Sequence, residues 1–327
     1  MSISAAVADW YRSNARDLPW RRHGFSAWGT LVSEFMLQQT PVVRVIPKLE
    51  AWLNRWPSPE DLAAVPAGEA VRAWDRLGYP RRALYLHGAA VAITERHGGV
   101  VPRDIAELLA LPGVGDYTAR AVAVFAYGLR HPVVDTNVRR VIARAVDGSE
   151  HAGTPSSRDL SAMAALLPDD VHESTIVNAG MMELGAVICT ARSPQCASCP
   201  LRAQCAWRAA GYPAFAGTRS AGQKKYAGSD RQVRGLILAE LRASDIPVSH
   251  VEFAIVWTDA AQLARAVRSL ERDGLIVAVD SVATKASIDS DGLDASEAQN
   301  NSEAQNDSET QNDSEIQACT ECHYRLP

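Results

Sequence analysis

Four of the six cysteines of this 327-residue chain lie in a stretch of seventeen residues, and their spacing constrains the fold around them. They form the pattern C-x6-C-x2-C-x5-C, at Cys189, Cys196, Cys199 and Cys205. In a chain without a secretory signal, such a cluster indicates metal ligation rather than disulfides. Four thiolates of one loop can hold zinc or a [4Fe-4S] cluster. Structural zinc sites use two short pairs separated by a longer segment, so the single short pair here favours iron and sulfur.

The part of the chain before and around these cysteines has the periodicity of helices. Apolar residues recur at spacings of three and four over residues 28–39, 59–77, 83–97 and 117–127, and Pro and Gly separate these segments. Strand-like alternation is absent there. We therefore predict an all-α body over residues 1–212.

Beyond the helical body the composition changes. Residues 213–229 are small, polar and basic, which is typical of a linker. Residues 230–280 contain helical stretches at 231–243 and 260–273, which bracket a third helical segment at 248–257, and they end in a strand-like run at 275–279. This order of elements predicts a small winged-helix-like domain over residues 230–280.

The end of the chain carries an acidic repeat of six residues, which begins at Ser296, Ser302 and Ser308. Residues 281–327 contain ten acidic and two basic residues and few apolar ones, so we predict a disordered tail. The chain has a net charge of −5, but the tail alone accounts for −8, which leaves +3 for residues 1–280. A mildly basic body permits binding to nucleic acid.

Composition and hydropathy give the broad class of the protein. Hydrophobic residues make up 47% of the chain and charged residues 22%, as in globular proteins generally. No apolar run is long enough to span a membrane, and the N-terminus lacks the features of a secretory signal. We expect a cytoplasmic monomer without a membrane partner. The remaining cysteines, Cys319 and Cys322, are weak evidence for a second metal or redox site.

A glycine-rich turn, Leu111-Pro-Gly113-Val114-Gly115, lies between two helical segments. Its glycines allow close approach of the backbone to a ligand, and the helix that follows begins with unpaired N–H groups. This arrangement suits a phosphate, although a simple connection between helices is the alternative.

Two carboxylates lie where they can take part in chemistry. Glu34 belongs to a strongly apolar helical segment, so it is either on a solvated face or deliberately buried. Burial would raise its pKa and suit it to donate a proton near neutral pH. Asp135 follows a short apolar run and begins a helix, which it can cap. The first turn of a helix also keeps an acid ionised, so Asp135 can face a developing cation.

In this order, LPGVG, VDTNV and the cysteine loop resemble the endonuclease III superfamily of DNA glycosylases, over roughly residues 5–210. Within that superfamily the sequence SEFMLQQT, residues 33–40, matches the SE-x-MLQQT of the MutY branch. Residues 74–79, WDRLGY, are similar to the WxGLGY segment of the same branch, with Asp75-Arg76 where a glycine is more typical.

The endonuclease III branch carries a lysine nucleophile two residues after GVG. This chain has Tyr117 at that position and no lysine between Lys48 and Lys224, so it lacks the amine of a Schiff-base lyase. The resemblance is therefore to the MutY branch, whose members excise adenine opposite 8-oxoguanine.

The resemblance implies a two-lobed helix-hairpin-helix body that flips adenine, mispaired with 8-oxoguanine or guanine, out of double-stranded DNA and hydrolyses its N-glycosidic bond. It implies that Glu34 protonates adenine and then activates water, and that Asp135 stabilises the oxocarbenium-like sugar, with Tyr117 and Asn137 in support. It also implies a structural [4Fe-4S] cluster. DNA contacts are implied for Gln38, Gln39, Thr40, Tyr79, Leu111, Gly113, Val114 and Gly115.

Members of the MutY branch usually carry a Nudix-like C-terminal domain that reads the 8-oxoguanine strand, and residues 230–280 are too few for it. How this chain would sense 8-oxoguanine therefore stays open. Two alternatives also stay open. One is an endonuclease III-like or thymine/uracil mismatch glycosylase. The other is a non-catalytic iron–sulfur DNA-binding module, which the presence of both carboxylates disfavours.

Overall fold

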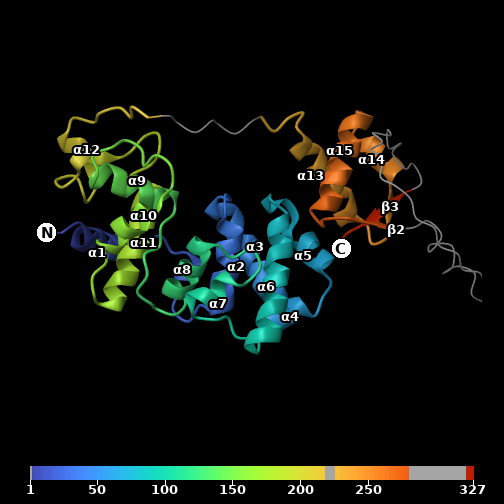
Figure 1. Cartoon of the computed structure of the whole chain (residues 1–327), viewed down its shortest axis with the longest axis horizontal. Helices are drawn as coiled ribbons and strands as arrows, with labels where there is room; N and C mark the ends of the chain where they lie inside the picture. The colour runs from blue at the N-terminus through green and yellow to red at the C-terminus, as the bar shows by residue number, and fades with distance from the viewer. Residues whose placement is uncertain (1, 218–224, 280–321) are drawn as a thin grey trace, which may run out of the picture. The chain divides into compact units, whose positions relative to one another are not determined.

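The computed structural model describes residues 2–217, 225–279 and 322–327. The chain divides into two compact units, Met1–Gln223 and Lys224–Pro327, which we call unit 1 and unit 2 (Figure 1). Part of the predicted linker, residues 218–224, lies outside the described residues.

The regular secondary structure in the described part of unit 1 is entirely helical, as predicted. Short 3-10 turns η1 (Pro19–Arg21), η2 (Asp75–Leu77) and η3 (Cys196–Ser198) lie between or beside its helices. The helices are α1 (Ile3–Asn14), α2 (Ala27–Leu37), α3 (Val42–Arg55), α4 (Pro59–Ala63), α5 (Ala67–Trp74), α6 (Arg81–His97), α7 (Ile105–Leu109), α8 (Asp116–Phe125), α9 (Thr136–Ala145), α10 (Ser157–Ala164), α11 (Val171–Val187) and α12 (Ala206–Ala209).

Helix α2 is the central helix of the first lobe. It begins at the Ser26 cap, whose hydroxyl accepts a hydrogen bond from the Gly29 N–H at 2.9 Å. Every residue from Trp28 to Met36 is buried, because α3, α6 and α8 pack around this helix. A helix that is apolar on all faces is stable only in such a position.

The second lobe forms around α11, against which α1 and α9 pack (Figure 1). Its core contains Val7, Val138, Met181 and Leu184, which come from segments far apart in the sequence. The N-terminal helix thus lies with the helices that follow α8, and the two-lobed body predicted from the sequence is confirmed.

A buried carboxylate ties the N-terminal segment to α11. Glu183 has a fully buried side chain, and it accepts hydrogen bonds from Arg16 at 2.7 Å and Arg21 at 2.8 Å. Burial raises the pKa of Glu183, but the two guanidinium groups outweigh it and lower the pKa to about 2. This ion-pair network therefore holds the segment after α1 on the second lobe.

Unit 2 has the topology of a winged helix-turn-helix. Its elements are α13 (Asp230–Ala243), β1 (Val248–Ser249), α14 (His250–Val256), α15 (Ala260–Arg272), β2 (Val277–Val279) and β3 (His323–Arg325). The three strands form an antiparallel sheet of order β1-β3-β2, in which Tyr324 is opposite both Val248 and Ala278. Phe253 and Tyr324 are buried in the core of this unit.

The end of the chain differs from the prediction of a tail over residues 281–327. Residues 323–325 form the central strand of the sheet, and Tyr324 is only 6% exposed. A strand this short is hidden in the sequence by the acidic repeat before it, and the repeat itself lies outside the described residues. The repeat therefore connects β2 to β3 instead of ending the chain.

Of the Cys319-x2-Cys322 pair, Cys322 is disulfide-bonded, and Cys319 lies outside the described residues. Among the described residues, no helix combines the length and the apolar character needed to cross a bilayer.

Candidate functional site

The carboxyl group of Glu34 is buried inside the first lobe. Glu34 lies on α2 and is 5% exposed, and its Oε2 atom has no hydrogen-bond partner. Burial, together with the nearby charge of Asp135, raises the pKa of Glu34 to about 7, although a hydrogen bond from Tyr117 lowers it. The solvated alternative is thus excluded, and the group can be neutral or ionised near neutral pH.

Asp135 caps α9 from the second lobe. Its Oδ1 atom accepts the Val138 N–H at 2.7 Å, and its Oδ2 atom accepts the Asn137 side-chain amide at 2.7 Å. Burial raises the pKa of Asp135 above its ordinary value, and these hydrogen bonds and the charge of Arg140 only partly offset that rise. Helix N-termini also favour a negative charge, so the position suits an ionised carboxylate.

Tyr117 connects the two carboxylates. It lies on the first turn of α8, directly after the glycine-rich turn. Burial first, and then the charges of Glu34 and Asp135, raise the pKa of Tyr117 well above its ordinary value. The three side chains therefore form one electrostatic group, although their positions in the sequence are far apart.

This group contains two carboxyls in unlike environments. Glu34 is desolvated and can carry a proton at neutral pH, whereas Asp135 has hydrogen-bond donors on both oxygens. Carboxyls with divergent environments are the arrangement of an acid and an electrostatic stabiliser in glycosyl hydrolysis. The geometry can therefore protonate a leaving group and stabilise a developing cation.

The residues expected to probe DNA lie on two strained turns. Gln39 follows the end of α2, is exposed and has φ +56°; Tyr79 precedes α6, is 41% exposed and has φ +48°. Positive φ is uncommon for such residues and is held only by strong surrounding contacts. Gln38 is half-buried, and Thr40 is buried with its hydroxyl against the Leu77 carbonyl at 3.3 Å.

A buried arginine that sequence reasoning missed joins these turns. The Arg82 guanidinium donates to the carbonyl oxygens of Phe35 at 2.7 Å, Gln38 at 2.6 Å and Gly78 at 2.9 Å. It also donates to the Thr40 hydroxyl at 3.0 Å, and burial lowers its pKa to about 10. Arg82 is the second arginine of an ordinary helix start, so nothing in the sequence marks it.

The glycine-rich turn has buried apolar anchors and an exposed backbone. Leu111 and Val114 are buried, whereas Gly113 and Gly115 are exposed. Gly113 has φ +75°, and a Cβ atom there would lie 2.4 Å from the Cβ of Tyr85. Gly115 caps α8 without a side chain, so the first N–H groups of a ten-residue helix are available to an anion.

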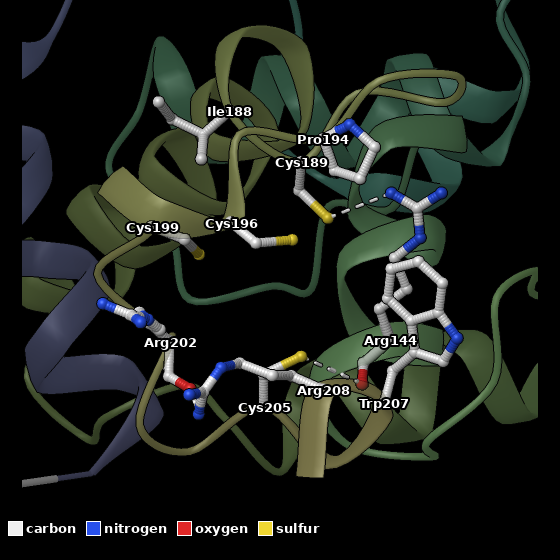
Figure 2. Close-up of a pocket in the computed structure, with 10 residues that line it drawn as sticks. All are labelled: Arg144, Ile188, Cys189, Pro194, Cys196, Cys199, Arg202, Cys205, Trp207 and Arg208. Carbon is white, nitrogen blue, oxygen red and sulfur yellow. Dashed lines mark hydrogen bonds between the residues drawn. The ribbon is translucent and has the colours of Figure 1, made fainter. Parts of the chain in front are cut away.

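The four clustered cysteines surround one cavity in the second lobe (Figure 2). Cys189 follows α11, Cys196 begins η3 and Cys205 caps α12, while Cys199 lies between the last two. Arg144, Arg202 and Arg208 are among the residues that line this cavity.

Four thiols around a shared cavity are the donor set of an iron–sulfur cluster. Among the described residues, no three His, Cys, Asp or Glu side chains lie in position to hold a single metal ion. The Arg144 guanidinium donates to Cys189 Sγ at 3.5 Å and stacks on Trp207 at 4.8 Å, so one sulfur already has a cationic neighbour.

The structure places the predicted residues in two regions of unit 1 that share helix α9. Asp135 caps the N-terminus of this helix, and Arg140 and Arg144 of the helix donate hydrogen bonds to the cysteine loop. Arg140 donates to Asn137 Oδ1 at 2.7 Å and to the Cys189 carbonyl at 2.7 Å. Sequence reasoning missed the roles of these two arginines, since arginines in a helix usually lie on its solvated face, whereas Arg144 is buried.

The sequence of the chain is similar to a family of DNA repair proteins and to individual members of it. Residues 32–159 match the family model of the HhH-GPD superfamily base excision DNA repair protein. Adenine DNA glycosylase of Mycolicibacterium smegmatis is 55% identical over 278 residues, which cover 84% of this chain and 93% of the relative. Adenine DNA glycosylase of Mycobacterium tuberculosis is 54% identical over 271 residues, with 82% and 88% covered.

Solved structures resemble unit 1. A thermostable thymine-DNA glycosylase superposes with a TM-score of 0.58 at 28% identity, covering 63% of this chain and 95% of that one. A complex of endonuclease III with DNA gives a TM-score of 0.55 at 25% identity, covering 64% and 99%. The family expected from the sequence motifs is confirmed: the chain belongs to the adenine DNA glycosylases of the HhH-GPD superfamily of base excision DNA repair proteins.

Proposed function

We propose that this protein binds mismatched double-stranded DNA, flips an adenine out of the stack and hydrolyses its N-glycosidic bond. The observation that carries the proposal is the buried Glu34 carboxyl, whose pKa lies near 7 and whose Oε2 atom has no partner. A group in this state can hold a proton for a leaving base at neutral pH. The adenine DNA glycosylases that are 54–55% identical to this chain over 82–84% of its length support the choice of base.

The reaction divides between Glu34 and Asp135. Glu34 gives its proton to a ring nitrogen of adenine, so the electrons of the breaking C–N bond leave with a neutral base. The sugar becomes oxocarbenium-like, and the Asp135 carboxylate stabilises its positive charge. Glu34, now ionised, accepts a proton from the attacking water, which restores the carboxylic acid and completes the hydrolysis.

The surrounding residues keep each carboxyl in its role. Asn137 and the Val138 N–H hold both oxygens of Asp135, which supports its ionised form. Tyr117 lies beside both carboxyls, and it stands where a lyase of this superfamily would carry lysine. Since no lysine occurs between Lys48 and Lys224, we propose a monofunctional enzyme that leaves an abasic site without cutting the strand.

We further propose that Cys189, Cys196, Cys199 and Cys205 hold a [4Fe-4S] cluster. When bound, it would cross-link residues 189–205 and supply structure rather than redox chemistry, because hydrolysis transfers no electrons. Arg192 and Arg202 of this loop, and Arg208 on α12 directly after it, would remain available to DNA phosphates.

The base opposite adenine is the finer part of the proposal. We propose 8-oxoguanine or guanine, with Gln39 and Tyr79 entering the helix near the mismatch. Both residues are exposed on turns that Arg82 holds at positive φ, which supports a rigid probe rather than a mobile loop. The exposed N–H groups at Gly115 would hold the phosphate backbone.

The test uses duplexes with adenine opposite 8-oxoguanine, adenine opposite guanine, and thymine glycol opposite adenine. Strand breaks are scored with and without hot alkali, for the wild type and for Glu34→Gln. We expect alkali-dependent breaks at adenine in the first two duplexes, abolished by the substitution. Alkali-independent breaks at thymine glycol would contradict the proposal, as would DNA binding without any base release.

A further inference from the structure

Unit 2 presents a row of arginines on the outer face of one helix. Arg265, Arg268 and Arg272 lie at helical spacings of three and four along α15, and all three are exposed. The opposite face of α15, which includes Leu263 and Leu270, is buried, because it packs on α13. The arginine row is therefore fixed in direction by the core of the unit.

Few acidic side chains neutralise the positive charge of this arginine row. Arg265 has a long contact of 3.6 Å with Asp230, and both side chains are more than half exposed. Neither Arg268 nor Arg272 has an ion pair within the described ranges of the chain, and the one exposed acid on the same stretch of α15 is Glu271. The outer face of α15 therefore has a net positive charge and needs a partner rich in negative charge.

The fold around the row is a helix-turn-helix. Helices α14 and α15 are joined by a short turn, residues 257–259, and α15 begins at the Asp259 cap, which accepts the Gln262 N–H at 2.9 Å. The turn is rigid because the Gln262 side chain accepts from the Trp257 indole at 3.0 Å and donates to the Gly228 carbonyl at 3.0 Å. In this motif the second helix is the one that lies against the DNA major groove.

We propose that α15 is a second DNA-binding element, which holds undamaged duplex through phosphate contacts from Arg265, Arg268 and Arg272. The exposed residues at its N-terminal end are Ala260 and Ala261, which carry no hydrogen-bonding side chain for base edges. The contact is therefore independent of sequence, as suits an enzyme whose substrate occurs anywhere along a duplex.

Binding of undamaged duplex by α15 goes beyond the proposed function, because unit 2 takes no part in breaking the glycosidic bond. It gives the chain a second contact with the duplex. The chain would have this contact even though residues 230–280 are too few for the Nudix-like C-terminal domain that is usual in the MutY branch. Since an undamaged duplex contains nothing to excise, its binding can be measured whether or not the protein releases adenine.

The test measures the Kd of the full-length protein for a fluorescent, undamaged duplex over a series of salt concentrations. The variant Arg265→Gln/Arg268→Gln/Arg272→Gln is expected to weaken binding on the order of tenfold at low salt. The slope of log Kd against log salt should fall by about 0.9 for each phosphate that is no longer neutralised, or about 2.7 for three. The matched control Arg265→Lys/Arg268→Lys/Arg272→Lys retains the charge and should retain the slope.

A second variant guards against simple loss of folding. Glu271→Lys adds a cation to the same face, in the last turn of α15 where a positive charge favours the helix. It should tighten binding and raise the salt slope by about 0.9. A Gln variant that keeps its helical content with an unchanged Kd and slope would overturn the proposal, and so would Glu271→Lys with wild-type binding.

Discussion

The buried position of Glu34 has a consequence for stability that needs no DNA to observe. Its pKa of about 7 in the folded protein compares with an ordinary value of 4.5. Below pH 4.5 the carboxyl is protonated in both the folded and the unfolded state, so its ionisation does not change the free energy of unfolding. Between these values only the unfolded state loses the proton, and folding becomes less favourable by about 1.4 kcal/mol per pH unit. Above pH 7 the accumulated cost is about 3 kcal/mol.

Glu34→Gln removes this titration, so its stability relative to the wild type should rise with pH. For a unit of 223 residues, a change of 1 kcal/mol in the free energy of unfolding moves Tm by about 2–4 °C. The Tm of the variant minus that of the wild type should therefore increase by roughly 6–12 °C between low and high pH. The assay is thermal unfolding followed by circular dichroism at pH 4.5 and pH 8. The quantity compared is the Tm of the variant minus that of the wild type, so the other titrating groups cancel.

A matched control is Glu107→Gln, which changes an exposed glutamate on α7. The difference in Tm for this control should stay nearly constant between the two pH values. If the difference for Glu34→Gln also stays constant, then Glu34 titrates as an ordinary solvated acid. The reasoning that makes it a proton donor at neutral pH would then be refuted.

Three further substitutions test other parts of the site. Asp135→Asn should reduce single-turnover excision by roughly 10²–10³-fold. It should lower Tm only modestly, because asparagine still caps the helix although one of the two hydrogen bonds to Asp135 is lost; an unchanged excision rate together with a lower Tm would indicate a purely structural role. Glu183→Gln should lower the free energy of unfolding at pH 7 by up to roughly 3 kcal/mol. Because the pKa of Glu183 is lowered to about 2, this loss of stability should shrink as the pH falls from about 4.5 toward 2. Denaturant unfolding at neutral pH and at low pH measures the difference. Arg82→Lys, which retains the charge but not the planar fork, should reduce the preference for mismatched over undamaged duplex, measured as a ratio of Kd values; an unchanged ratio would contradict its role in holding the two turns.

Much of the candidate site was predictable because short sequence motifs specify its local structure. In LPGVG, position 113 must be glycine because a side chain there would clash with Tyr85. The position of Asp135 follows from the start of helix α9, which it caps. The burial of Glu34 was left open, although the helix around it has apolar residues on every face. A helix without a polar face has no solvated side, and this physical argument favours burial.

Other features could not be predicted because they depend on long-range contacts. The hydrogen bonds of Arg82 join residues separated by more than forty positions, and no local pattern marks an arginine that binds backbone carbonyls. The strand at 323–325 is equally hidden, since three residues carry too little periodicity to stand out after an acidic repeat. Its place in the sheet depends on pairing with β1 and β2.

The most direct test of the central claim is the release of free adenine in a single turnover, measured between pH 5 and pH 9 on a duplex with adenine opposite 8-oxoguanine. Asp135 must be ionised and Glu34 protonated, so the rate should rise with pH at the acid end and fall above about pH 7. A rate that falls tenfold per pH unit on the alkaline side would support Glu34 as the proton donor. A rate that stays level or increases up to pH 9, or no release of adenine at any pH, would contradict the account.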